Sequence, residues 1–177
     1  MSITNRLNLN KPVLKTLVRL YLSFAAVLAL FIGGFNVEWV HLRVVVPFTS
    51  LVAGAASLLM NLFGAGSYVS ENILSTSSYS ISIVDGCNGI YATAILISGV
   101  VAYPSSIREK GLGILLGVTA VFAMNLVRVI SLFYLGQHYP SIFTEAHVYV
   151  WQPIIILWAI FVWDYWSRKV HDTREAK

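Results

Sequence analysis

The chain has 177 residues, of which 57% are hydrophobic and only 11% are charged. Because ordinary globular domains carry roughly a quarter charged residues, this composition excludes a water-soluble domain and indicates an integral membrane protein. The formal net charge of +4 comes mainly from Lys and Arg near the two ends. No basic face or nucleic-acid-binding motif accompanies them, so we expect no nucleic-acid partner.

Long uncharged runs predict membrane helices in chain order, because about 20 helical residues cross the hydrocarbon core of a bilayer. The runs extend over 20–37, 44–70, 86–107, 111–144 and 147–163, with Arg128 as the only charge in the fourth. No internal repeat, low-complexity tract or flexible linker divides the chain. We therefore expect one domain over 1–177, an all-α multi-pass transmembrane bundle of about four to six membrane helices.

The distribution of Lys and Arg predicts the orientation, since cytoplasmic flanks of membrane helices are enriched in these residues. The tails 1–19 and 167–177 and the loop 104–111 are basic and are expected in the cytoplasm, whereas 64–86 and 134–147 contain no Lys or Arg and are expected outside. Helices over about 87–104, 112–134 and 147–166 satisfy this pattern. An aromatic belt at the cytoplasmic interface is predicted from Trp158, Trp163, Tyr165 and Trp166.

The first third of the chain must then cross the membrane an odd number of times. Two apolar runs occur there, separated by "NVEWVHLR". We expect 20–36 to cross as a retained signal-anchor helix rather than a cleaved leader. The second run, 41–63, contains Pro47 and many small residues, and we expect it to be re-entrant or interfacial, with a full crossing as the alternative.

Between residues 64 and 85 the pattern changes to alternation. Tyr79, Ile81 and Ile83 alternate with serines, which is the period-two signature of a half-buried strand. We expect a small external β-hairpin before the next helix.

The only cysteine, Cys87, follows this strand in "VDGCNGI". Gly86 and Gly89 suit a tight turn, and Asp85 is a candidate N-cap that would place Cys87 in the first turn of a helix, where free N–H groups and the helix dipole favour a thiolate. The alternative is that Cys87 is a small buried hydrophobic residue. A single cysteine excludes an intramolecular disulfide and a cysteine-based metal cluster.

Arg128 interrupts an otherwise uncharged helix. A charge in a membrane segment costs about 2.5–3.5 kcal/mol on insertion scales, so such residues usually face a bundle interior or an aqueous cavity. Asn125, Arg128 and Ser131 are spaced i, i+3, i+6 and share one helical face, which we expect to point inward. The alternative is that Arg128 snorkels to the interface from roughly four to six residues inside its helix end.

His147 opens the last predicted helix, and taken alone it could be an ordinary interfacial histidine. Cys87 begins one helix, Arg128 lies near the end of the next, and His147 begins the third, so the hairpin topology brings all three to one face of the membrane. A thiol, an imidazole and a guanidinium are the groups needed for acyl transfer through a thioester. The other histidines lack metal-site spacing, so neither a metal nor a cofactor is expected.

Three motifs carry a resemblance to a known family: "CNGIYATAIL" from Cys87, "NLVRVISLFYLG" from Asn125 and "AHVYVWQ" from Ala146. In that order they resemble the exosortase and archaeosortase family of membrane cysteine transpeptidases, closest to the exosortase H subgroup. The resemblance implies that Cys87 is the nucleophile, His147 the general base and acid, and Arg128 the oxyanion or orienting group. The expected supporting residues are Asp85, Gly86, Asn88, Gly89 and Asn125.

The resemblance also implies the substrate and the location. The enzyme would cleave a C-terminal sorting tail of exported proteins, made of a short motif of the IPTLxxWG type, a transmembrane helix and a basic end. It would pass the product through a thioester to an acceptor nucleophile that the sequence does not identify. We expect a bacterial inner-membrane protein with its active site at the external face. The alternative function is a non-enzymatic membrane scaffold or a small transporter in which Arg128 binds an anion and Cys87 is inert.

Overall fold

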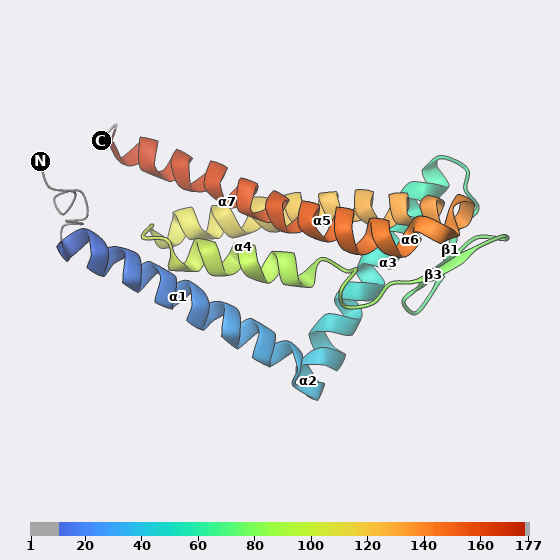
Figure 1. The fold of residues 1–177 in the computed structure, drawn as a ribbon, viewed down its shortest axis with the longest axis horizontal. Helices are drawn as coiled ribbons and strands as arrows, with labels where there is room; N and C mark the ends of the chain where they lie inside the picture. Colours follow the sequence, from blue (N-terminus) through green and yellow to red (C-terminus); the bar gives the residue numbers. More distant parts are fainter. Residues whose placement is uncertain (1–10, 176–177) are drawn as a thin grey trace, which may run out of the picture.

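A computed structural model describes residues 11–175, and the outermost parts of the predicted tails, 1–10 and 176–177, lie outside the described residues. The long helices are α1 (Lys11–Phe35), α3 (Val46–Leu62), α4 (Ile90–Ala102), α5 (Ile107–His138) and α7 (Gln152–Glu175) (Figure 1). Short helical pieces extend two of them: α2 (Glu38–Val40) and the π-helix η2 (His41–Val45) precede α3, and η3 (Pro140–Ile142), α6 (Phe143–Glu145) and the π-helix η4 (Ala146–Trp151) precede α7.

Four continuous helical segments within the described residues are long and apolar enough to cross a membrane. They are Val13–Phe35, Glu38–Leu62, Ile107–His138 and Pro140–Thr173, while Ile90–Ala102 is apolar but shorter. The prediction of a mostly helical, multi-pass membrane bundle is therefore confirmed.

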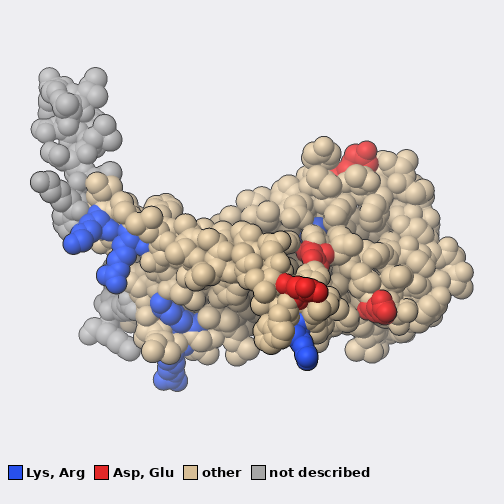
Figure 2. Space-filling model, turned by 90° about the horizontal axis from the view of Figure 1, so that it is seen from below, with Lys and Arg blue, Asp and Glu red and all other residues tan. Residues whose placement is uncertain are grey.

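The helices of the bundle run alternately in two directions. In Figure 1, α1 begins and α7 ends at the same end of the molecule. Helices α1 and α5 run away from this end, and α4 and α7 run back toward it. Most Lys and Arg side chains gather at this same end (Figure 2), which we call the basic end. The predicted hairpin order of α4, α5 and α7 therefore matches the observed directions.

The second apolar segment has a different course. Glu38–Leu62 is one continuous helix with the length and composition of a membrane span. In Figure 1, however, α3 runs obliquely across the end opposite the basic end, from the far end of α1 toward the sheet, rather than back along α1. That this segment does not cross the bilayer stays a prediction.

Helix α5 begins earlier and ends later than predicted. Ser106 caps it, because the Ser106 side chain accepts from the Glu109 N–H while the Glu109 carboxylate accepts from the Ser106 N–H. The second half of the expected loop 104–111 is thus the first helical turn. The helix is long enough to pack in two cores, one with α4 and α7 near the basic end and one with α3 and the sheet beyond it.

Close packing near the basic end depends on small residues of α4 and α5. A Cβ added at Gly113 would lie 2.5 Å from the Trp166 ring, and one at Gly99 would lie 2.8 Å from the Trp163 ring. The ring of Tyr103 contacts both tryptophans edge-on. Two members of the predicted aromatic belt therefore also fill the space between helices, as expected where membrane helices approach closely over small residues.

The predicted small β-structure before the cysteine is present as a three-stranded antiparallel sheet of β1 (Tyr68–Ser70), β2 (Ile73–Ser75) and β3 (Ser80–Ser82), in the order β1-β2-β3. The alternation of serines with apolar residues at 78–83 extends beyond both ends of β3 and marked it, whereas no such alternation surrounds β1 and β2. Leu74 and Ile83 are almost fully buried against α3 and α5. The sheet thereby anchors the loop that leads to Cys87.

Candidate active site

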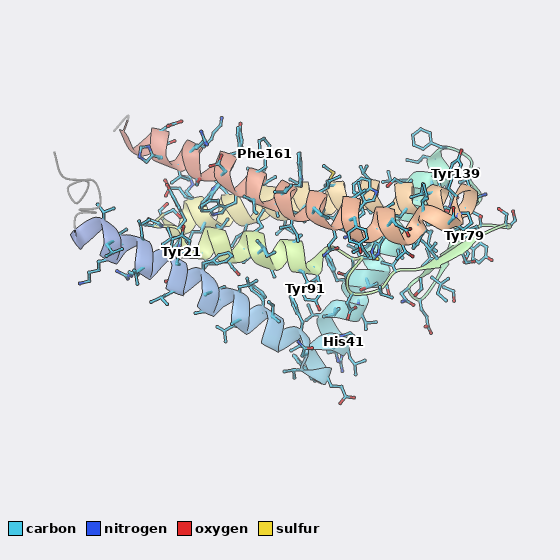
Figure 3. All side chains as sticks on the ribbon, in the orientation of Figure 1. Tyr21, His41, Tyr79, Tyr91, Tyr139 and Phe161 are labelled. Carbon is cyan, nitrogen blue, oxygen red and sulfur yellow. The ribbon has the colours of Figure 1, made fainter. Side chains whose placement is uncertain are left out.

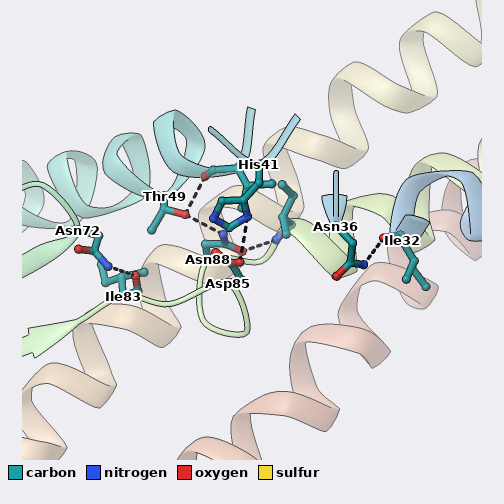
Figure 4. A network of polar contacts seen from close by, with 10 residues as sticks. Ile32, Asn36, His41, Thr49, Asn72, Ile83, Asp85 and Asn88 are labelled. Carbon is teal, nitrogen blue, oxygen red and sulfur yellow. Dashed lines mark hydrogen bonds and ion pairs between the residues drawn. The ribbon is translucent and has the colours of Figure 1, made fainter. Parts of the chain in front are cut away.

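Cys87 lies in the turn that precedes α4, not in the first turn of the helix as predicted. Its N–H donates to the Val84 carbonyl at 2.7 Å. The helix begins only at Ile90 because Gly89, its N-cap, has a φ of +80°, and a regular right-handed helix cannot pass through a left-handed residue. The expected capping by Asp85 is wrong: its carboxylate lies 3.5 Å from Nδ1 of His41 (Figure 4).

Asn88, the residue before the N-cap, bonds to the start of α4 in place of Asp85. Its Oδ1 accepts from the Ile90 N–H at 3.0 Å, and its Nδ2 donates to Oγ1 of Thr49 at 2.8 Å. Thr49 in turn donates to the Val45 carbonyl at 2.8 Å (Figure 4). Asn88 and Thr49 are both buried, so this chain of bonds fixes the cysteine turn to α3. Sequence reasoning missed Thr49, because no spacing links it to the cysteine motif.

Cys87 and His147 meet directly. The distance from Sγ of Cys87 to Nε2 of His147 is 2.8 Å, and the imidazole stacks on the Phe143 ring. His147 belongs to the π-helix η4, in which the N–H of Gln152 bonds to the His147 carbonyl five residues earlier. The wider turn places the side chains of His147 and Gln152 on the same side of the helix, and π-turns of this kind are frequent at functional sites.

Arg128 lies in the same cluster, deep in the protein. Its side chain is only 1% exposed, and one terminal nitrogen, Nη2, donates to the Gly86 carbonyl at 3.1 Å and to Oε1 of Gln152 at 2.9 Å. Because the guanidinium is buried and bonded inside the protein rather than exposed at an interface, the snorkelling alternative is wrong. The expected inward face is confirmed for Asn125 and Arg128, which are both buried.

Three polar atoms of this inward face are buried without a hydrogen-bond partner: Nε of Arg128 and both Nδ2 and Oδ1 of Asn125. A Cβ on Gly89 would lie 2.9 Å from Cγ of Asn125, so this glycine is required by a close approach as well as by its φ. Gly86, in contrast, has open space around its Cα; it contributes its carbonyl. No ion pair joins Arg128 to a carboxylate among residues 13–173.

The model of the transmembrane exosortase family (Exosortase_EpsH) matches residues 15–163 of the sequence. The chain belongs to this family. Membership implies a membrane cysteine transpeptidase that acts on sorting-tail substrates in general. Searches of curated proteins and of solved structures gave no match.

The surroundings of Cys87 shift the pKa of its thiol in two directions. Burial raises the pKa of the Cys87 thiol, while the positive charge of Arg128 and a hydrogen bond from the Val84 backbone act in the opposite direction. The net rise favours the protonated thiol, whereas the helix N-terminus was expected to favour the thiolate. Nε2 of His147 lies within hydrogen-bond reach of Sγ, where a base could accept the thiol proton.

Two hollows flank the cysteine turn. A hollow of about 800 Å³ lies on the α3 and sheet side and includes Thr49, Asp85 and Gly86 in its wall. A much smaller one of about 30 Å³ lies on the α4 and α7 side, where Gly86, Arg128 and Gln152 line it. No group of three His, Cys, Asp or Glu that could hold a metal occurs in the described part of the chain.

Proposed function

We propose that the protein is a cysteine transpeptidase that cleaves the C-terminal sorting tail of exported proteins, with Cys87 as nucleophile. His147 acts as general base and acid, and Arg128 stabilises the oxyanion. The observation that carries the proposal is the 2.8 Å distance between Sγ of Cys87 and Nε2 of His147, which come from residues 60 positions apart. A thiol and an imidazole within this distance form a nucleophile and base pair.

The reaction follows from these positions. Nε2 of His147 takes the thiol proton while Sγ attacks the scissile carbonyl carbon, giving a tetrahedral oxyanion. The C–N bond then breaks, and the imidazolium gives its proton to the leaving amine, which leaves the exported protein as a thioester on Cys87. An acceptor nucleophile attacks that thioester, loses its proton to His147 and regenerates the thiol.

Arg128 is suited to the oxyanion because no carboxylate among residues 13–173 neutralises its charge. Nη2 is already bonded to Gly86 and Gln152, whereas Nε is buried and unpartnered. Arg128 also lines the hollow of about 30 Å³, roughly the volume of one water molecule, which has room for a carbonyl oxygen. A preorganised donor in a site shielded from water stabilises negative charge that develops there.

The length of α5 supports an external active site. Arg128 lies 21 residues after Ile107, where the helix begins at the basic end, so the two are about 31 Å apart along the axis, close to the thickness of the hydrocarbon core. With the basic end in the cytoplasm, Cys87 lies near the outer surface of the bacterial inner membrane and both termini are cytoplasmic. The substrate is a tail of the IPTLxxWG type, as in the exosortase H subgroup.

The test is cleavage of a tailed reporter coexpressed with the enzyme and followed by immunoblot. Cys87→Ala and His147→Ala should abolish processing, whereas His138→Ala, which changes an exposed histidine at the end of α5, should leave it intact. Undiminished processing by Cys87→Ala would refute the assignment of the nucleophile.

A further inference from the structure

An apolar groove of about 300 Å³ lies on the membrane-spanning part of the molecule, between α1, α4 and α7. We call it the lateral groove. Residues of all three helices line it, among them Leu20 and Tyr21 of α1, Ile95 of α4, and Ile160 of α7. The floor along α4 and α7 is made partly of Gly99, Ala102 and Ala159, and small residues allow another helix to approach closely in a membrane.

The lateral groove leads to the active site. Ile95 lines both the groove and the small hollow beside Arg128 and Gln152, so the two are neighbours along α4. Figure 3 shows Tyr21 and Tyr91 at the two ends of the space between α1 and α4. Tyr21 lines the groove and Tyr91 lines the small hollow, and together these hollows extend from near the basic end to the cysteine turn.

An unpartnered polar atom lies where this path ends. Nε of Arg128 is buried without a partner, and Arg128 lines the small hollow. An unsatisfied buried donor costs about 1–3 kcal/mol. A lipid acyl chain could fill the apolar walls of the lateral groove but would not satisfy this donor. A sorting tail supplies an apolar helix for the groove and, in the peptide that precedes the helix, a carbonyl oxygen for Arg128.

We propose that the lateral groove binds the transmembrane helix of the substrate's sorting tail, on the assumption that the proposed function is correct. One face of that helix packs on α1, α4 and α7. The peptide that precedes the helix continues past Ile95 into the small hollow, where its carbonyl oxygen meets Arg128 beside Cys87. The groove thus delivers the scissile bond from within the bilayer.

Cross-linking tests where the helix binds, and it does not require catalysis. Cys87 is the only cysteine in the chain, so Cys87→Ser gives a cysteine-free enzyme. Leu20→Cys and Ile160→Cys place a thiol in the groove, whereas Leu22→Cys and Leu116→Cys place one at strongly exposed positions outside the groove lining. Each variant is coexpressed with a reporter that carries an IPTLxxWG motif, a transmembrane helix with one cysteine at its middle and a basic end, and is oxidised with copper phenanthroline.

The groove variants should form the disulfide with the reporter at least tenfold more than the control variants. Equal yields from groove and control positions would overturn the proposal. So would efficient cross-linking of the groove positions to a photoactivatable phospholipid in place of the reporter.

A second measurement uses the active enzyme. Ile160→Trp fills the groove, and it should lower cleavage of the reporter at least tenfold while leaving the rate at which methyl methanethiosulfonate modifies Cys87 unchanged. Phe161→Trp changes the neighbouring exposed residue and should cleave normally. Equal cleavage by the two variants would contradict the proposal.

The two hypotheses fail in different ways. If the wild-type enzyme cleaves the reporter but the groove cysteines do not cross-link selectively, the groove proposal is wrong and the proposed function stands. If the groove cysteines cross-link selectively but the wild-type enzyme never cleaves the reporter, the groove binds the helix and the proposed function is wrong.

Discussion

Replacing Arg128 by lysine separates the charge of the side chain from its geometry. The guanidinium holds Gly86 and Gln152 through Nη2 and leaves Nε directed at no protein partner. A lysine keeps the positive charge but has a methylene where Nε was, and its single nitrogen cannot reproduce the planar fork. If Nε donates to the oxyanion, the loss of one such donor costs about 2.7–4 kcal/mol, or about 10²–10³-fold in kcat.

We therefore expect Arg128→Lys to process the tailed reporter about 10²–10³-fold more slowly than the wild-type enzyme. The assay is a time course of reporter cleavage in detergent or proteoliposomes at saturating substrate. Arg43→Lys, a change at an exposed arginine of η2, is the matched control and should cleave at the wild-type rate. A wild-type kcat for Arg128→Lys, with the protein folded, would refute the role of the guanidinium.

Three further predictions concern the cysteine turn. Thr49→Val leaves Nδ2 of Asn88 buried without a partner, at a cost of about 1–3 kcal/mol, so this variant should have a lower Tm and cleave the reporter more slowly. Thr49→Ser keeps the hydroxyl and should behave as the wild-type enzyme. An equal loss in both variants would show that the hydroxyl is not needed. Gly89→Ala should lower Tm because residue 89 has a φ of +80° and a Cβ there would contact Asn125. Gly86→Ala should retain the wild-type Tm. A larger fall in Tm for Gly86→Ala than for Gly89→Ala would contradict the geometry. Alkylation of Cys87 by a small neutral reagent, measured by mass spectrometry, should increase with pH around a midpoint raised by burial. Arg128→Gln should move the midpoint higher, because it removes a charge that stabilises the thiolate; a lower midpoint would contradict this sign.

The sequence predicted the features that depend on hydrophobicity over long stretches. The uncharged runs predicted the membrane helices, and the order of hairpins predicted that Cys87, Arg128 and His147 come together. The spacing of Asn125 and Arg128 predicted an inward face. Each of these follows from the cost of exposing polar groups to lipid, which is large and local to the chain.

The features that the sequence did not predict depend on contacts between distant segments. The start of α4 is set by the left-handed conformation of Gly89, which no periodicity in the sequence reveals. Asp85 resembled an N-cap because it stands just before the segment that was predicted to be helical. Thr49 and Gln152 became important only through bonds to Asn88 and Arg128 on other elements. The charged residues after Ser106 resembled a loop although Ser106 and Glu109 form a capping box.

The central claim is that Sγ of Cys87 carries the exported protein as a thioester. Hydroxylamine attacks thioesters, so the wild-type enzyme incubated with the tailed reporter and hydroxylamine should release the exported portion with a hydroxamate at its new C-terminus, detected by mass spectrometry. The Cys87→Ala variant should release none. Cleavage by the wild-type enzyme that yields only a free carboxylate at all hydroxylamine concentrations, or hydroxamate formation by Cys87→Ala, would contradict the account.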